Sequence, residues 1–136
     1  YTTLSDLMLI EPAIYLGTLL QEVRLGGAKV EIRRFSRLDE VLTLPQDTIF
    51  NCSGLGSKEL FLDDELIPIK GQLNVLLPQP EVDYNLIAGN LYMFPRSDGI
   101  VLGGTYERGN WDTNPDDEVS ERLLAEHREL FAGFPG

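Results

Sequence analysis

Apolar residues recur with helical and strand-like spacing through the first half of the chain. After Pro12 they fall one helical turn apart, and Gly26-Gly27 is typical of a helix end, so the pattern predicts a helix between them. Residues 4–10, 29–35 and 48–52 are apolar or alternating and predict strands. Short helices are expected at residues 38–42 and 57–60. This alternation of helix and strand is typical of an α/β unit, in which ligands bind at the carboxyl ends of the strands.

The second half of the chain has a different pattern. Residues 67–77, 91–94 and 100–102 predict strands, and the short links between them favour antiparallel pairing. A last amphipathic helix carries its apolar residues on one face, at Val119, Leu123, Leu124, Leu130 and Phe131. The predicted fold class is therefore α+β, with an α/β part and a mixed sheet.

Length and composition limit what the chain does. Its 136 residues are enough for one domain, and 43% apolar with 24% charged residues is ordinary globular composition. The net charge of −11 disfavours binding to nucleic acid or to an anionic membrane. No run approaches the ~18 apolar residues of a membrane span. Neither end resembles a natural terminus, because the chain starts at Tyr1 and stops just after a helical pattern, so we expect a fragment of a longer protein.

Metal binding and nucleophilic catalysis receive little support. The single histidine, His127, has no Cys or His at a ligand spacing, so no metal site is predicted and a position on the surface or edge of its helix is expected. The single cysteine, Cys52, excludes an internal disulfide and ends a predicted buried strand, where cysteine commonly acts as a small apolar residue. The acidic clusters at residues 63–65 and 116–118 are typical of solvated turns and helix starts.

Two glycine-containing segments and one tyrosine are better candidates for a functional site. A loop of six residues follows a predicted strand and comprises Asn51, Cys52, Ser53, Gly54, Leu55 and Gly56. Its glycines allow close approach of a phosphate or cofactor ring, although the spacing alone favours an ordinary tight turn. Gly71-Gln72 lies inside a predicted strand, which indicates either a bulge or a close approach. Tyr92 lies among apolar neighbours, and that pattern alone favours a core position.

Taken in order, several segments resemble the D-amino-acid oxidase family of FAD-dependent amine oxidoreductases. The segments are Glu11-Pro-Ala-Ile-Tyr15-Leu16, Phe50-Asn-Cys-Ser-Gly-Leu-Gly-Ser-Lys-Glu-Leu60, Pro68-Ile-Lys-Gly-Gln72, Tyr92-Met-Phe-Pro-Arg96, Gly99-Ile-Val-Leu-Gly-Gly-Thr105 and Gly109-Asn-Trp-Asp112. Each motif is short, but their common order and spacing over nearly the whole chain are specific.

The resemblance implies a fold, a cofactor and a reaction. It implies the central part of a two-domain flavoprotein, with a flavin-edge part of the Rossmann-like FAD domain at about 29–60 and the mixed sheet and helix of the substrate domain at about 67–131. It implies oxidation of a D-amino acid by hydride transfer to FAD, with oxygen as the electron acceptor. The loop at residues 51–56 and Gly71-Gln72 would then border the FAD, and the Tyr92 hydroxyl would contact the substrate carboxylate as the catalytic-site residue.

The departures from the family pattern are also informative. Lys70 replaces the usual arginine, and Ala88 stands where animal members have a second active-site tyrosine. The glycine-rich stretch that binds the pyrophosphate and the Gly-x-Arg-Pro segment that binds the substrate carboxylate do not occur in this sequence. We therefore expect this chain by itself to be inactive and prone to self-association through exposed apolar faces.

Two alternatives stay open at this point. The first is an oxidase or dehydrogenase of glycine, sarcosine or another amine, since these enzymes share the overall plan. The second, of another class, is a non-catalytic acidic interaction domain that kept the fold without the cofactor. A cytoplasmic location is expected, or a peroxisomal one if the source is eukaryotic.

Overall fold

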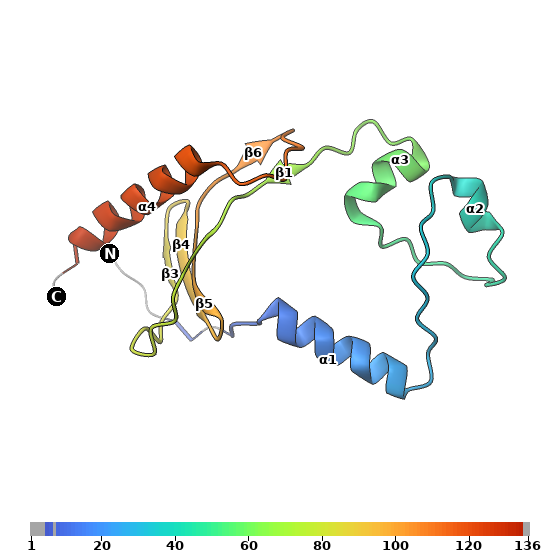
Figure 1. Cartoon of the computed structure of the whole chain (residues 1–136), viewed down its shortest axis with the longest axis horizontal. Helices are drawn as coiled ribbons and strands as arrows, with labels where there is room; N and C mark the ends of the chain where they lie inside the picture. Colours follow the sequence, from blue (N-terminus) through green and yellow to red (C-terminus); the bar gives the residue numbers. More distant parts are fainter. Residues whose placement is uncertain (1–4, 7, 135–136) are drawn as a thin grey trace. The chain divides into compact units, whose positions relative to one another are not determined.

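The computed structural model describes residues 5, 6 and 8–134. They belong to two compact units, residues 1–34 and residues 35–136. The elements are coloured along the chain in Figure 1. None of the helices in the described residues has the length and apolar character that a membrane span requires.

The first unit contains one helix, α1 (Pro12–Leu25), as the sequence predicted. Pro12 occupies the first helical position, where its missing N–H costs nothing. The helix ends at Gly26, and Gly27 has a φ of +89°, a conformation that glycine adopts without strain. All the described side chains of α1 are exposed, including Ile14 and Leu16.

Three predicted strands are not formed. Residues 5, 6 and 8–10 of the expected strand at 4–10 have no regular structure, and residues 4 and 7 lie outside the described residues. The segments 29–35 and 48–52 also have no regular structure, although both carry strand-forming residues. A strand is stable only when its backbone N–H and C=O groups have a neighbouring strand, and neither segment is paired with one in the described part of the chain.

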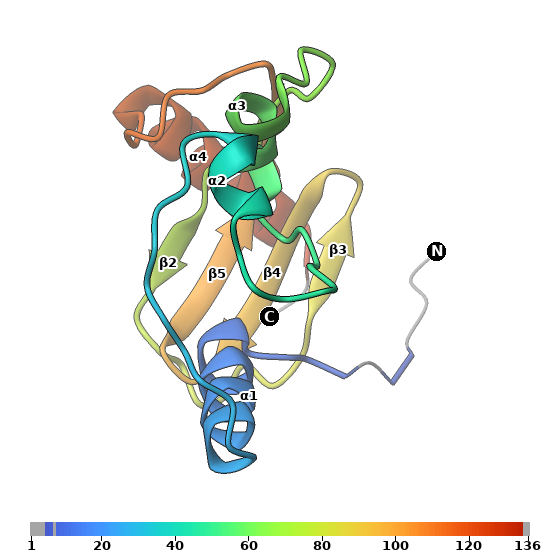
Figure 2. The same ribbon diagram turned by 90° about the vertical axis from the view of Figure 1, so that its right-hand side faces the viewer.

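The second unit is built around a four-stranded antiparallel sheet. Its strands are β2 (Asn74–Leu76), β5 (Gly99–Gly103), β4 (Leu91–Arg96) and β3 (Leu86–Ala88), in that spatial order. Figure 2 shows them side by side. A second, two-stranded sheet pairs β1 (Ile69–Lys70) with β6 (Glu107–Arg108), also antiparallel. Every strand pair in the described residues is antiparallel, so the mixed sheet of the prediction is wrong there. For β3–β4 and β4–β5 the physical reason is that short links join consecutive strands and cannot make a parallel crossover.

The predicted strand at 67–77 is divided in two. The chain leaves β1 after Lys70, passes Gly71-Gln72, and enters β2 at Asn74, so that each part joins a different sheet. The single strand that was predicted over 67–77 is therefore wrong, and the break lies at residues 71–73.

The core lies between one face of the four-stranded sheet and the last helix, α4 (Asp117–Ala132). Met93, Ile100 and Leu102 are buried in the cluster, and Leu124 and Phe131 of α4 pack against it. Leu123 is the most deeply buried side chain, at 1% exposure. The predicted amphipathic helix is thus confirmed, and its apolar face covers the sheet. Asp116 caps the start of α4, and its side chain accepts a hydrogen bond from the Val119 N–H.

The opposite face of the sheet is formed by the alternate residues. Val75, Val101 and Phe94 face each other across three strands, as do Gly103, Tyr92 and Ile87. The centre of this face is covered by its own side chains, since Val101 is buried. Its margins are open, with Val75 56% and Ile87 64% exposed.

Three short helical segments precede the sheets in the second unit. They are α2 (Leu38–Leu42), the 3₁₀ turn η1 (Gly54–Gly56) and α3 (Ser57–Phe61). Both short helices that the sequence predicted are confirmed. Leu62 ends α3 in the left-handed conformation, with φ +56°.

Candidate functional site

A hollow of about 550 Å³ brings together segments that are far apart in the sequence. Leu55 of η1, residues 68–73 around Gly71, and residues 110–115 line it. Trp111 lies in its wall and is half exposed. Leu55, Gly71 and Gln72, three of the residues predicted to border a cofactor, therefore lie around one space.

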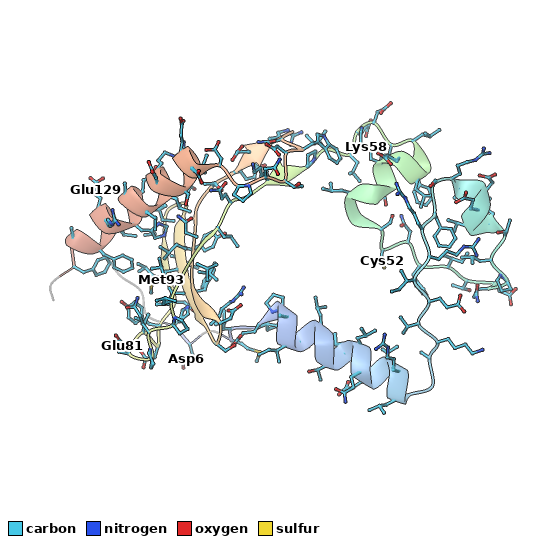
Figure 3. The ribbon with its side chains drawn as sticks, viewed as in Figure 1. Asp6, Cys52, Lys58, Glu81, Met93 and Glu129 are labelled. Atoms are coloured by element: carbon cyan, nitrogen blue, oxygen red, sulfur yellow. The ribbon has the colours of Figure 1, made fainter. Side chains whose placement is uncertain are left out.

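The loop at residues 51–56 is held by its own hydrogen bonds. Asn51 accepts two of them at Oδ1, from the Ser53 N–H at 3.1 Å and from Ser53 Oγ at 2.7 Å, and its Nδ2 donates to Ser57 Oγ at 3.1 Å. Gly54 has φ +56°, and a Cβ added there meets no atom within 4 Å. The loop is therefore a self-supporting turn whose backbone is open on its outer side. Figure 3 shows it with the side chain of Cys52 labelled.

Gln72 links the hollow to the start of α4. Its Nε2 donates to the carbonyl oxygen of Asp116 at 2.7 Å, and its Oε1 accepts from the Asp116 N–H at 2.9 Å. Its backbone N–H donates to Thr105 Oγ1 at 2.6 Å. Both the nitrogen and the oxygen of the Gln72 side-chain amide are hydrogen-bonded to the Asp116 backbone. The side chain beside the hollow is therefore fixed in place. Gly71 is exposed beside it, and a Cβ there would lie 3.6 Å from the Thr105 oxygen, which is ordinary contact.

Lys70 and Asp112 hold the far wall of the hollow. Lys70 Nζ donates to the Asn114 carbonyl oxygen at 2.9 Å. Asp112 Oδ1 accepts from the N–H and from the side-chain amide of Asn114, at 2.9 and 2.7 Å. The hydrogen bond from the Asn114 backbone, with the side-chain bond and the charge of Lys70, lowers the pKa of the Asp112 carboxyl below its usual 3.8. Lys70 thus fixes the loop that carries Trp111.

Tyr92 lies on the sheet face opposite α4 and does not line the hollow. Its ring stacks on Phe94, with centroids 5.1 Å apart, and lies directly over Gly103 of the neighbouring strand. A Cβ at Gly103 would overlap the Tyr92 ring, so glycine is required there. No hydrogen bond joins the Tyr92 hydroxyl to any residue that the structure describes. These contacts fix the position of the ring.

Two predictions about single residues are wrong. His127 is buried at 2% exposure, because α4 turns it toward the sheet with Leu123 one turn earlier. Cys52 is exposed, because the strand that was expected to bury it has no partner. No group of three or more His, Cys, Asp or Glu residues in the described part of the chain is placed to hold a metal ion.

A comparison with protein-family models decides the family. The model for FAD dependent oxidoreductases matches residues 4–136. The chain belongs to this family. D-amino-acid oxidase of Rubrobacter xylanophilus is 41% identical over 118 residues, which is 84% of this chain and 36% of that protein. Human D-aspartate oxidase is 35% identical over 126 residues, with 92% of this chain and 36% of the relative covered. D-amino-acid oxidase of Streptomyces coelicolor is 32% identical over 126 residues, covering 88% and 38%.

The chain spans about a third of the length of the curated relatives that it matches. The predicted resemblance to this FAD-dependent family is confirmed. The two assignments of residues to the family's sites, Tyr92 to the substrate and residues 51–56 with 71–72 to the cofactor, stay predictions. Trp111 was not singled out as a site residue from the sequence, although an aromatic residue inside a polar, irregular segment was the available signal.

Proposed function

We propose that this chain is part of an enzyme that oxidatively deaminates D-amino acids. The substrate loses a hydride from its α-carbon and a proton from its amine, and the resulting imino acid hydrolyses to a keto acid and ammonia. When bound, FAD supplies the hydride acceptor, and oxygen takes the electrons afterwards. The names of the relatives and the family's dependence on FAD support this proposal.

The observation that carries the proposal is the setting of Tyr92. Its hydroxyl has no partner among the described residues, and its ring is fixed between Phe94 and the bare backbone of Gly103. A phenol held in this way donates a hydrogen bond to a carboxylate without losing much side-chain entropy on binding. We assign to Tyr92 the contact with the substrate carboxylate, in agreement with the resemblance of residues 92–96 to the family.

The residues around the hollow fit the edge of a flavin cofactor. Gly54 and Gly71 leave their backbones accessible, and the loop at 51–56 is held by its own hydrogen bonds. Backbone N–H groups in such a turn hydrogen-bond ring carbonyls or phosphate oxygens. We propose that residues 51–56 and Gly71 face the cofactor, and that Gln72 contributes by holding the start of α4.

The chain by itself is proposed to be inactive and to self-associate. It spans about a third of its relatives, and large apolar side chains are exposed on α1 and on segments 29–35 and 48–52, for example Ile32 and Phe50. Light scattering of the purified chain across a concentration series tests the self-association. A constant monomer mass over the series would contradict it.

The function is tested on the longer protein, purified with its flanking segments. Its absorbance between 300 and 550 nm is recorded under nitrogen before and after adding D-alanine, with L-alanine as the matched control. We expect flavin bands that bleach with the D-enantiomer only. D-Aspartate in a parallel sample tests the acidic substrate that the name of the human relative suggests.

Other outcomes identify the alternatives. Bleaching with sarcosine or glycine but with no D-amino acid would favour an amine oxidase of that type. A folded protein without flavin bands would contradict the enzyme and favour an acidic interaction domain, for which the net charge of −11 is the supporting observation.

A further inference from the structure

The one histidine of the chain is buried beneath the sheet, directly behind Tyr92. His127 is 2% exposed and lies on α4. Its Nε2 is 3.2 Å from the carbonyl oxygen of Tyr92, and its Nδ1 is 2.8 Å from the carbonyl oxygen of Leu123. The proposed reaction leaves this residue without a role.

Both neighbours of the imidazole are acceptors, and this fixes the direction of the bonds. A carbonyl oxygen has no hydrogen to give, so a ring nitrogen bonds to it only as an N–H donor. A neutral ring with its hydrogen on Nε2 makes the bond to Tyr92, one with its hydrogen on Nδ1 makes the bond to Leu123, and a ring protonated on both nitrogens makes both bonds. A buried ring that donated to neither carbonyl would cost free energy for the unpaired groups.

Through this bond, Tyr92 has contacts on both faces of the sheet. The Tyr92 side chain projects to the face opposite α4, while the Tyr92 carbonyl oxygen is held from the α4 side. On its own face the ring is already limited by Phe94 and Gly103. The backbone of Tyr92 is paired with β3 and β5 within the sheet, and His127 adds a contact to its carbonyl oxygen from the α4 side.

We propose that His127 is a positioning residue for Tyr92, acting through an Nε2–H hydrogen bond to the Tyr92 carbonyl oxygen. It touches neither substrate nor cofactor. The inference rests on the proposed function, in which the Tyr92 hydroxyl contacts the substrate carboxylate and its position therefore affects binding. The hydrogen bond itself is tested separately from the reaction.

Two substitutions separate the two ring nitrogens. His127→Gln places an amide donor near the position of Nε2, and His127→Asn places it near Nδ1. Both remove the ring, so both lose similar packing. If His127 positions Tyr92, His127→Gln retains the position of the Tyr92 ring and His127→Asn displaces it. Leu124→Ala is the packing control, since Leu124 lies against the same core and makes no bond to Tyr92.

The first readout does not require activity. The longer protein is labelled with 3-fluorotyrosine, and the Tyr92 signal is assigned by its loss in Tyr92→Phe. We expect the fluorine resonance of Tyr92 to move in His127→Asn and to stay in place in His127→Gln and Leu124→Ala. Equal shifts in both histidine variants, or a shift in neither, would overturn the proposal.

The second readout is kinetic and uses the flavin-loaded enzyme. We expect KM for the D-amino acid to rise about tenfold in His127→Asn, as for the loss of one hydrogen bond to a charged group, with kcat nearly unchanged and partial recovery in His127→Gln. Absence of D-amino-acid oxidation in the unsubstituted protein would reject the proposed function, whereas the fluorine result would still decide the bond.

A measurement without substitution covers the case in which both variants fail to fold. His127 is the only histidine of the 136-residue chain, so in this chain the nitrogen-15 signals of labelled histidine all come from one ring, and only Nδ1 and Nε2 have to be distinguished. We expect a hydrogen on Nε2. A ring whose Nε2 carries no hydrogen would overturn the proposal, because the bond to the Tyr92 carbonyl oxygen cannot then form.

Discussion

Two regions of the chain have similar residues but different structures. One is the four-stranded sheet with α4, and the other comprises the segments 29–35 and 48–52. Both are rich in β-branched and apolar side chains. In the first region β5 has strands on both sides and is buried along its whole length. In the second, Ile32 and Phe50 are almost fully exposed, and neither segment forms a strand. The difference teaches that a strand depends on the presence of its neighbour more than on its own composition.

The family gives this difference a meaning. The chain spans about a third of the length of its relatives, and we propose that other parts of a longer protein supply strand partners for residues 29–35 and 48–52. The sheet with α4, by contrast, contains its own hydrogen-bond partners and its own core. The following predictions test how independent the two regions are.

The largest expected effect comes from removing the most buried side chain. Leu123→Ala creates a cavity between α4 and the sheet and should lower the free energy of unfolding by about 2–5 kcal/mol. Ile32→Ala, the matched control, should change it by less than about 0.5 kcal/mol, because that side chain is exposed in this chain. Urea unfolding followed by circular dichroism measures both. Equal effects of the two substitutions would show that residues 29–35 are packed after all.

The contact between Tyr92 and Gly103 ranks second. Gly103→Ala puts a methyl group into the space of the Tyr92 ring and should cost about 1–3 kcal/mol of unfolding free energy. In Tyr92→Ala the space is free, so adding Gly103→Ala to that variant should cost much less. Additive effects in this double-mutant cycle would refute the contact.

A polar link at the edge of the sheet is expected to contribute less. Asn74 donates from Nδ2 to the Ser120 carbonyl oxygen at 2.9 Å and accepts from Ser120 Oγ. Asn74→Ala should cost about 1 kcal/mol in thermal unfolding, as for a typical protein hydrogen bond. A value near zero would mean that water replaces the bonds without loss.

Gly71→Ala should separate folding from cofactor binding. The nearest atom to the new Cβ is 3.6 Å away, and the backbone of Gly71 needs no left-handed conformation, so stability should change by less than about 1 kcal/mol. If Gly71 faces FAD in the longer protein, the flavin content after purification should fall. An unchanged flavin-to-protein absorbance ratio would place the cofactor elsewhere.

The smallest expected effect is that of acid on the loop of Trp111. The folded-state pKa of Asp112 is lowered by its bonds to Asn114, so its contribution to stability is present above the ordinary value of 3.8 and is lost as pH falls through the lower folded value. Trp111, the one tryptophan of the chain, reports the change by fluorescence. Asp112→Asn should flatten this part of the acid titration, and an unchanged titration would assign it to another carboxyl group.

The helices and the central hairpin were predictable because their signals are local. Helical spacing marked α1 and α4, and β-branched residues with short links marked β4 and β5. The strands β3 and β6 were missed, since segments of three and two residues carry too little pattern to detect. The expected strands at 29–35 and 48–52 failed because the sequence shows strand propensity but not whether a partner is present.

The candidate site was predictable only in part. The resemblance singled out Leu55, Gly71 and Gln72, and the structure places them around one hollow. The resemblance does not reveal that Gln72 holds the start of α4, because a hydrogen bond between residues 44 apart leaves no local sequence pattern. His127 was wrongly predicted at the helix surface. Helical spacing identifies the apolar face of α4, but it does not show whether a histidine at the border of that face is buried.

The pairing of Tyr92 with Gly103 also has a consequence for how such chains diverge. A bulky residue at position 92 and any side chain at position 103 exclude each other sterically. Drift at position 103 therefore stays blocked until position 92 has changed to a smaller residue, and that first change removes the hydroxyl. Sequences that lose the tyrosine can then vary at both positions, whereas sequences that keep the tyrosine also keep the glycine.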